Sequence, residues 1–121
     1  MNKAGKIVLG TVQFGCQYGI NSAGRPSPEA VKAILGEAAA GGIATLDTSC
    51  AYGDAEQMLG STGRVADFRI VSKFLRTPGA SVAGTFSRSL AQLGVNRVYG
   101  YLIHHFSDWV EDPALWDALQ E

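Results

Sequence analysis

The sequence has no long apolar segment and no cluster of basic residues, and each absence excludes a class of protein. Every apolar run is interrupted well before it could cross a bilayer, and no signal-type core follows residues 1–6. With 10 Lys and Arg against 11 Asp and Glu, the chain offers no basic stripe for a nucleic-acid backbone. We therefore expect a cytoplasmic protein that binds a small molecule and neither nucleic acid nor membrane.

Cysteine is also scarce. The two cysteines, Cys16 and Cys50, fit neither a metal-ligand spacing nor a disulfide framework. We predict no metal site and interpret both residues as reduced packing residues.

The sequence alternates between apolar segments and helix start signals, and its 121 residues are enough for one domain. Residues 27–29, Ser-Pro-Glu, combine an N-cap, a proline at the first helical position and an acid in the first turn. Residues 112–114, Asp-Pro-Ala, repeat that start signal. The predicted strands are residues 6–10, 43–47, 68–73 and 98–104. The predicted helices are residues 28–40, 54–60, the segment from 80 to the stop at Gly94, and the segment from 113 onward, and a long loop covers residues 11–24.

Four successive strand–helix units predict a parallel sheet, because parallel neighbours need crossovers of this length. Such a sheet either opens into a doubly wound layer or closes into a barrel, and the periodicity alone leaves both open. The Gly-x-Gly-x-x-Gly fingerprint of doubly wound nucleotide-binding folds does not follow the first strand. Polar residues at the ends of successive strands instead favour an α/β fold of the (β/α)8 TIM-barrel type.

Only the first four βα units of such a barrel are present, and the last helical segment stops at residues 119–121 without a closing Gly, Asn or basic residue. A half barrel leaves two strand edges unpaired. We expect residues 1–121 to be the N-terminal half of one barrel domain, truncated in its fourth helix. The exposed edges would favour self-association.

Four reactive side chains stand near the predicted strand ends, namely Asp47, Tyr52, Lys73 and His104. Strand ends of a parallel barrel share one mouth, so these side chains should converge. A tyrosine has a reference pKa of about 10. A nearby ammonium lowers that pKa by stabilising the phenolate, and a carboxylate holds the ammonium charged and in place. Such a set could protonate an oxygen while another agent attacks the adjoining carbon, with the histidine orienting that oxygen.

Each of these residues has a simpler interpretation when taken alone. Asp47 could cap a turn, Tyr52 could pack over the rim, Lys73 could reach into water, and His104 could be a hydrogen-bonded core residue. These interpretations are independent of one another, whereas a single functional one explains all four residues. We favour the functional interpretation.

The same residues resemble the aldo-keto reductase family. Its signature matches in register at Gly42, Asp47-Thr48, Tyr52-Gly53, Glu56 and Leu59-Gly60, its third-strand Lys at Val71-Ser72-Lys73, its fourth-strand His at Tyr101-Leu102-Ile103-His104, and its opening strand at Leu9-Gly10-Thr11 with Phe14-Gly15. Two departures stand out, Ser49 in place of the usual Ala and His105 where many members have Trp. Strand alternation separates His104 from His105, and we take His104 as the acting histidine.

The resemblance implies a barrel that reduces an aldehyde or ketone, a small-molecule carbonyl substrate, with NADPH. Tyr52 would be the general acid, Lys73 and Asp47 would lower its pKa, and His104 would orient the carbonyl. Gly10 and Thr11 would lie near the nicotinamide and Asp47 at its ribose, with Gln17 as a further cofactor-side candidate. Most cofactor-binding residues would lie beyond residue 121, so we expect the isolated chain to be inactive.

Two other functions remain open at this point. Lys73 could be the Schiff-base nucleophile of an aldolase-like lyase, in which case the spacing of Asp47 and Tyr52 would be a coincidence. Alternatively, the chain could be a non-catalytic cofactor-binding or assembly module with a reductase-like fold.

Overall fold

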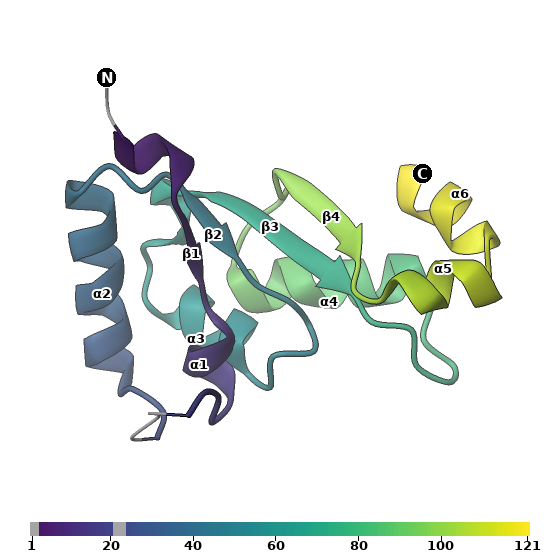
Figure 1. The fold of residues 1–121 in the computed structure, drawn as a ribbon, viewed down its shortest axis with the longest axis horizontal. Helices are drawn as coiled ribbons and strands as arrows, with labels where there is room; N and C mark the ends of the chain where they lie inside the picture. Colours follow the sequence, from purple (N-terminus) through teal and green to yellow (C-terminus); the bar gives the residue numbers. More distant parts are fainter. Residues whose placement is uncertain (1–2, 21–23) are drawn as a thin grey trace.

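A four-stranded parallel sheet forms the centre of the computed structural model, which describes residues 3–20 and 24–121 (Figure 1). The strands lie side by side in chain order, so each crossover leads to the adjacent position. Their bounds are β1 Val8–Gly10, β2 Thr45–Asp47, β3 Arg69–Phe74 and β4 Gly100–Ile103. The register aligns Leu9 with Leu46 and Leu46 with Ile70. The predicted parallel sheet is confirmed, and the strand order among the described residues does not reverse as a doubly wound sheet would.

Helices cover one face of this sheet (Figure 1). The core joins the inward side chains of the sheet, such as Leu46 and Ile70, to Leu35, Leu59 and Leu93 from three successive helices, all nearly inaccessible to solvent. The helical elements are η1 Lys3–Lys6, α1 Val12–Gly15, α2 Pro28–Ala40, α3 Ala55–Ser61, η2 Val65–Asp67, α4 Val82–Leu93, α5 Phe106–Glu111 and α6 Ala114–Gln120. Burial of these large apolar side chains is the main favourable contribution to folding here.

The two long helices begin and end as their sequences predict. The Ser27 hydroxyl accepts a hydrogen bond from the Ala30 amide at 3.1 Å at the start of α2, and Ser81 does the same for the Gly84 amide at 3.0 Å at the start of α4. Each cap satisfies an amide that has no partner inside the helix. Gly94 ends α4 in the left-handed conformation, with φ of 70°, which costs glycine little.

Several predicted boundaries are wrong. The first, second and fourth strands begin two residues later than predicted, and the fourth ends at Ile103, so that His104 follows the strand. The third strand continues through Phe74. Ile43 and Val98 pack against the core just before their strands begin, whereas Lys6 lies in η1 and Ile7 is 54% exposed.

The short α-helices α1 and α5 and the short 3-10 helices η1 and η2 were not predicted. The segment predicted as loop from 11 to 24 contains α1, where the Phe14 amide donates to the Thr11 carbonyl at 2.9 Å; residues 21–23 lie outside the described part of the chain. Helix α5 follows β4 directly, and its N-cap His105 makes no side-chain cap hydrogen bond. Asp112 accordingly ends α5, and Pro113 is the N-cap of α6 where the sequence pattern predicted the first helical residue.

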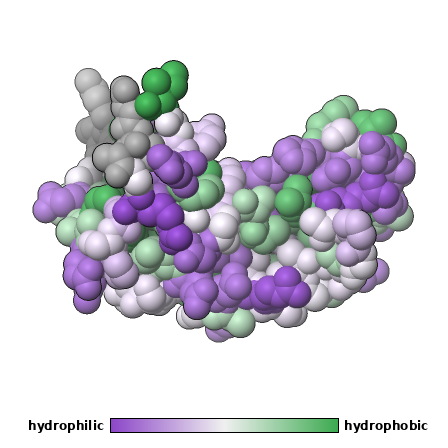
Figure 2. Space-filling model, turned by 90° about the horizontal axis from the view of Figure 1, so that it is seen from below, coloured by the Kyte–Doolittle hydropathy of each residue, from purple (hydrophilic) through white to green (hydrophobic). Residues whose placement is uncertain are grey.

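The other face of the sheet is open. Val8 and Leu102 lie on it and are 51% and 48% exposed, a large fraction for apolar strand residues. Seen from below (Figure 2), hydrophilic residues cover much of the surface, and hydrophobic residues are scattered among them. No helix within the described ranges is long and apolar enough to span a membrane.

Candidate active site

The carboxyl ends of the strands bring three of the predicted side chains to one edge of the sheet. Asp47 is the last residue of β2, Lys73 is the penultimate residue of β3, and His104 directly follows β4. Because β3 pairs its Val71 with Asp47, Lys73 lies beyond the end of β2. From there its ammonium can turn back toward Asp47.

The Lys73 ammonium has three hydrogen-bond acceptors. Its Nζ donates to Asp47 Oδ2 at 2.8 Å, to the Thr48 carbonyl at 2.9 Å and to the Tyr52 hydroxyl oxygen at 3.4 Å. An ammonium has three protons, so this set can use all of them. The Lys73 side chain is 14% exposed and that of Asp47 34%. The ion pair is therefore partly shielded from water yet open on one side.

Tyr52 lies in the loop between β2 and α3 and reaches the same point. Since its oxygen accepts a hydrogen bond from Lys73, its own hydroxyl proton is directed elsewhere. The Lys73 ammonium also lies 5.0 Å from the centre of the Tyr52 ring, within the range of a cation–π contact. In residues 3–20 and 24–121, the Tyr52 hydroxyl proton has no hydrogen-bond acceptor, and Lys73 contacts both the oxygen and the ring.

His104 completes the set. Its ring packs edge-on against Tyr52, with centroids 5.7 Å apart and an interplanar angle of 78°. Burial lowers the pKa of His104 below its usual value, and His105 and Lys73 lower it further, against smaller opposing effects of Asp108 and Asp47. The folded protein therefore favours the neutral imidazole. His105 is exposed and occupies the N-cap position of α5, so the structure brings His104 and not His105 to Tyr52.

The residues predicted for the cofactor side are brought together only in part. Thr11 is buried and ties β1 to Asp47, because its amide and hydroxyl both donate to the Asp47 carbonyl, at 3.1 and 2.9 Å. Gly10 pairs with Asp47 across the two strands, and a Cβ placed on it would meet no atom within 4 Å. Gln17 is exposed, and among the described residues no hydrogen bond joins it to the other candidates.

The backbone around Tyr52 packs tightly against α1. A Cβ on Gly15 would lie 1.6 Å from the Tyr52 carbonyl oxygen, and a Cβ on Gly53 would lie 2.2 Å from the Gly15 carbonyl oxygen. Gly53 also has φ of 57°, a conformation that side chains disfavour. Arg25 adds an ion pair with Asp54 next to this corner. The position of Tyr52 therefore depends on two glycines that allow backbones to touch.

A second polar cluster lies on the opposite, helix-covered face of β3. The Ser72 hydroxyl donates to Glu56 Oε1 at 2.6 Å, and both residues are nearly inaccessible to solvent. Tyr101 lies near them, and burial, followed by the charges of Cys50 and Glu56, raises its pKa. In the sequence, Glu56 is only a match to the family signature. The structure shows it to be a buried carboxyl group away from the strand-end site.

One residue of the site was missed. Ser49 was interpreted as a small replacement for Ala, but it is fully buried and its Oγ lies 3.0 Å from His104 Nδ1. The sequence signal for this contact is the hydroxyl group of Ser49, at a position where the family signature usually has Ala. A polar group that replaces Ala inside an active-site corner needs a partner when buried.

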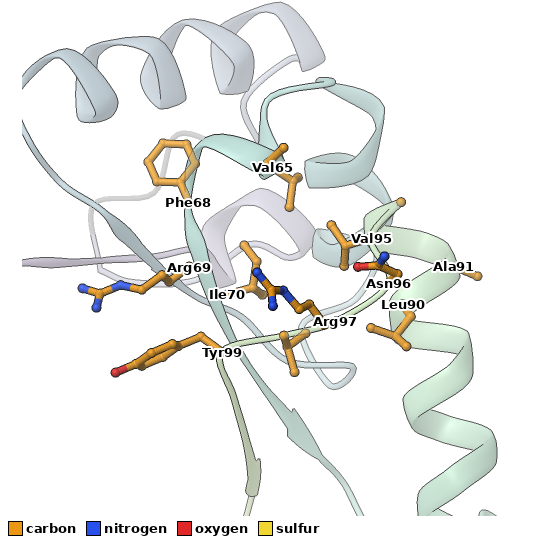
Figure 3. A pocket seen from close by; sticks show the side chains of 13 residues that line it. Val65, Phe68, Arg69, Ile70, Leu90, Ala91, Val95, Asn96, Arg97 and Tyr99 are labelled. Atoms are coloured by element: carbon orange, nitrogen blue, oxygen red, sulfur yellow. The ribbon is translucent and has the colours of Figure 1, made fainter.

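A cavity of about 980 Å³ lies at the other end of β3 and β4, away from these residues. Its lining includes Arg69, Arg97 and Tyr99 (Figure 3). The Arg69 guanidinium carbon lies 4.8 Å from the centre of the Tyr99 ring. None of the predicted site residues lines this cavity.

Comparison with known proteins identifies the family. Residues 6–121 match the family model described as the aldo/keto reductase family. The chain belongs to the aldo-keto reductase family. Two solved structures from Pseudomonas aeruginosa, both assigned as aldo-keto reductases, are similar to this chain. Each is 29% identical to it in sequence over 93% of its length, with TM-scores of 0.77 and 0.76. No curated protein sequence is a significant match.

This aldo-keto reductase chain spans about half the length of those structures, 49% of one and 47% of the other. The family comprises NAD(P)-dependent oxidoreductases. The predicted family and the predicted fold, four parallel βα units that match about half of a TIM barrel, are confirmed.

Proposed function

We propose that the full-length protein is an NADPH-dependent oxidoreductase that reduces an aldehyde or ketone to an alcohol. Residues 1–121 would be the N-terminal half of its barrel domain, with Tyr52 as the general acid. The observation that carries this proposal is the position of the Lys73 ammonium between the Asp47 carboxylate and the Tyr52 hydroxyl oxygen.

This geometry supports proton donation by Tyr52. The Tyr52 oxygen accepts from Lys73, and the described part of the chain offers no acceptor for the hydroxyl proton, which could therefore pass to a carbonyl oxygen. As the proton leaves, negative charge develops on the phenolic oxygen, and the adjacent ammonium stabilises it. Asp47 would hold that ammonium in position, because its Oδ2 accepts a hydrogen bond from Nζ at 2.8 Å. The neutral His104 ring beside Tyr52 can donate a second hydrogen bond to the same carbonyl oxygen and so orient it.

The cofactor would supply the hydride when bound. The described residues would supply part of a cofactor site. A Cβ on Gly10 would meet no atom within 4 Å, and Gly10 pairs with Asp47, whose carboxylate is partly exposed. Thr11 has its hydroxyl engaged by the backbone, so it would position Asp47. Gln17, exposed at the start of the following loop, stays a candidate on that side. We expect most binding residues to lie beyond residue 121 and the isolated chain to be inactive.

The Schiff-base alternative fits this geometry less well. A lysine attacks a carbonyl as the neutral amine, whereas Lys73 donates to three acceptors, one of them a carboxylate at 2.8 Å. Those contacts stabilise the ammonium, which has no lone pair. Failure of borohydride to trap a carbonyl compound on Lys73 is the expected result.

Oxidation of NADPH by the full-length protein in the presence of an aromatic aldehyde tests the proposal. Tyr52→Phe removes only the hydroxyl, and we expect turnover to fall by about 10²–10⁴-fold. Tyr99→Phe is the matched control, because Tyr99 is 67% exposed and lines the cavity at the far end of the sheet. An unchanged rate in Tyr52→Phe would remove Tyr52 from the mechanism. Binding of NADPH without any turnover of aldehydes or ketones would favour the non-catalytic module.

A further inference from the structure

Ser49 is held in place by the turn that it begins. Its Oγ accepts a hydrogen bond from the Ala51 amide at 3.0 Å, and its carbonyl accepts one from the Tyr52 amide at 3.2 Å. The side chain is fully buried. Its hydroxyl oxygen is therefore fixed between the backbone of the Tyr52 loop and the His104 ring.

The hydrogen-bond inventory then sets the direction of the contact with His104. With one lone pair of Oγ used by Ala51, the hydroxyl still has one proton to donate. Among residues 3–20 and 24–121, the acceptor within reach of that proton is His104 Nδ1, at 3.0 Å. If Nδ1 carried a proton instead, the buried Ser49 proton would have no acceptor, which is costly. Ser49 thus donates and Nδ1 accepts.

An imidazole that accepts at Nδ1 has its proton on Nε2. In the described part of the chain, no protein group forms a hydrogen bond with Nε2. The proton on Nε2 is therefore available to a ligand beside Tyr52, whose ring contacts that of His104. The lowered pKa of His104 agrees with a neutral ring that accepts a hydrogen bond.

We propose that Ser49 is a positioning residue that holds His104 in the neutral tautomer with the proton on Nε2, so that His104 can donate to the substrate oxygen. The role in turnover rests on the proposed function, whereas the tautomer does not. The proposal concerns this chain in particular, since the family signature usually has Ala at this position and so has no hydroxyl there.

The tautomer can be measured by long-range proton–nitrogen NMR on nitrogen-15-labelled full-length protein, with His104 assigned by comparison with His104→Gln. We expect the Nε2–H form to predominate at neutral pH. A predominant Nδ1–H form or a charged ring at neutral pH would overturn the proposal. This readout needs no substrate and applies even if the protein reduces no carbonyl compound, an outcome that would refute only the proposed function.

Ser49→Ala removes the donor and should be tolerated in folding, because Ala is the usual residue there. The lost hydrogen bond stabilised the neutral ring, so we expect a mixture of tautomers and a rise of about one pH unit in the His104 titration midpoint. The titratable groups around His104, namely Lys73, Asp47, Asp108 and His105, remain unchanged. Ser49→Thr keeps the hydroxyl and should restore the wild-type tautomer.

In turnover we expect Ser49→Ala to lower kcat by roughly 3- to 10-fold, with little change in KM. Ser107→Ala, an exposed serine close to His104 in the sequence, should change neither the spectrum nor the rate. If Ser49→Ala left the His104 tautomer and titration midpoint as in the unmodified protein, Ser49 would have no positioning role.

Discussion

Two polar clusters arise from adjacent residues of β3, and they differ in access to solvent. Lys73 contacts Asp47 and Tyr52 at the strand ends, where the Asp47 side chain is 34% exposed. Ser72 donates to Glu56 on the other face, where the two residues are 0% and 2% exposed. Side chains alternate between the two faces of the strand, so β3 separates two sets of side chains that could each donate or accept protons.

Solvent access, more than residue type, distinguishes the strand-end cluster from the cluster on the covered face. Each cluster includes a carboxyl group and has a tyrosine nearby. In the strand-end cluster an ammonium contacts the Tyr52 oxygen, whereas burial raises the pKa of Tyr101 on the covered face. A tyrosine whose proton is held more tightly is a weaker acid. We therefore expect substitutions in the two clusters to have opposite effects on activity and stability.

The largest effect should come from Lys73→Met, which keeps much of the side-chain volume and removes the charge. We expect kcat/KM for an aldehyde to fall by about 10²–10³-fold, because the developing phenolate loses its stabilising cation. The thermal midpoint should change little, since Asp47 remains partly solvated. Lys32→Met is the matched control on the exposed face of α2. Equal activity in Lys73→Met and Lys32→Met would abolish the distinction between the clusters.

Ser72→Ala should show the opposite pattern. It leaves Glu56 Oε1 without its donor, and Oε2 already has no partner among the described residues. We expect the free energy of unfolding to fall by about 1–3 kcal/mol, measured by denaturant titration, with kcat of the folded protein unchanged. The double variant Ser72→Ala with Glu56→Leu should recover part of that loss, because the unpaired Glu56 carboxyl group is then removed as well. A fall in kcat without a loss of stability would assign Ser72 to the active site.

The smallest effect concerns pH. The pKa of His104 is lowered in the folded protein relative to the ordinary value of 6.5. Between the folded and unfolded pKa values the unfolded chain binds more protons, so stability should fall as pH drops from about 6.5 through the folded value. His104→Gln should flatten this part of the stability curve, measured by thermal unfolding against pH. Superimposable curves for the two proteins would contradict the assignment.

Much of the strand-end site could be predicted because it depends on sequence order. Each apolar segment ends next to a reactive side chain, and parallel strands place those ends on one edge. The sequence thus predicts that Asp47, Lys73 and His104 converge. Their distances depend on strand register, such as the pairing of Val71 with Asp47, which the pattern does not specify.

Other features depend on contacts between distant residues or on weak local signals. The contact of Ser49 with His104 spans 55 positions, and each residue has a plausible role without the other. The pairing of Glu56 with Ser72 requires knowing which face of β3 the helices cover. Helix α5 has no side-chain cap at His105 to mark its start.

The contact between Gly15 and the Tyr52 loop has a consequence for how this protein tolerates mutation. Neither Gly15 nor Gly53 has a side chain to offer a ligand, yet any Cβ there would collide with backbone. In a saturation mutagenesis screen scored by activity, both positions should be as intolerant as Tyr52 itself. A parallel screen scored by abundance would separate them, since substitutions at the glycines reduce the amount of folded protein and Tyr52→Phe does not. Sensitivity to mutation around this site thus reports both the backbone packing between α1 and the Tyr52 loop and the proposed chemistry of Tyr52.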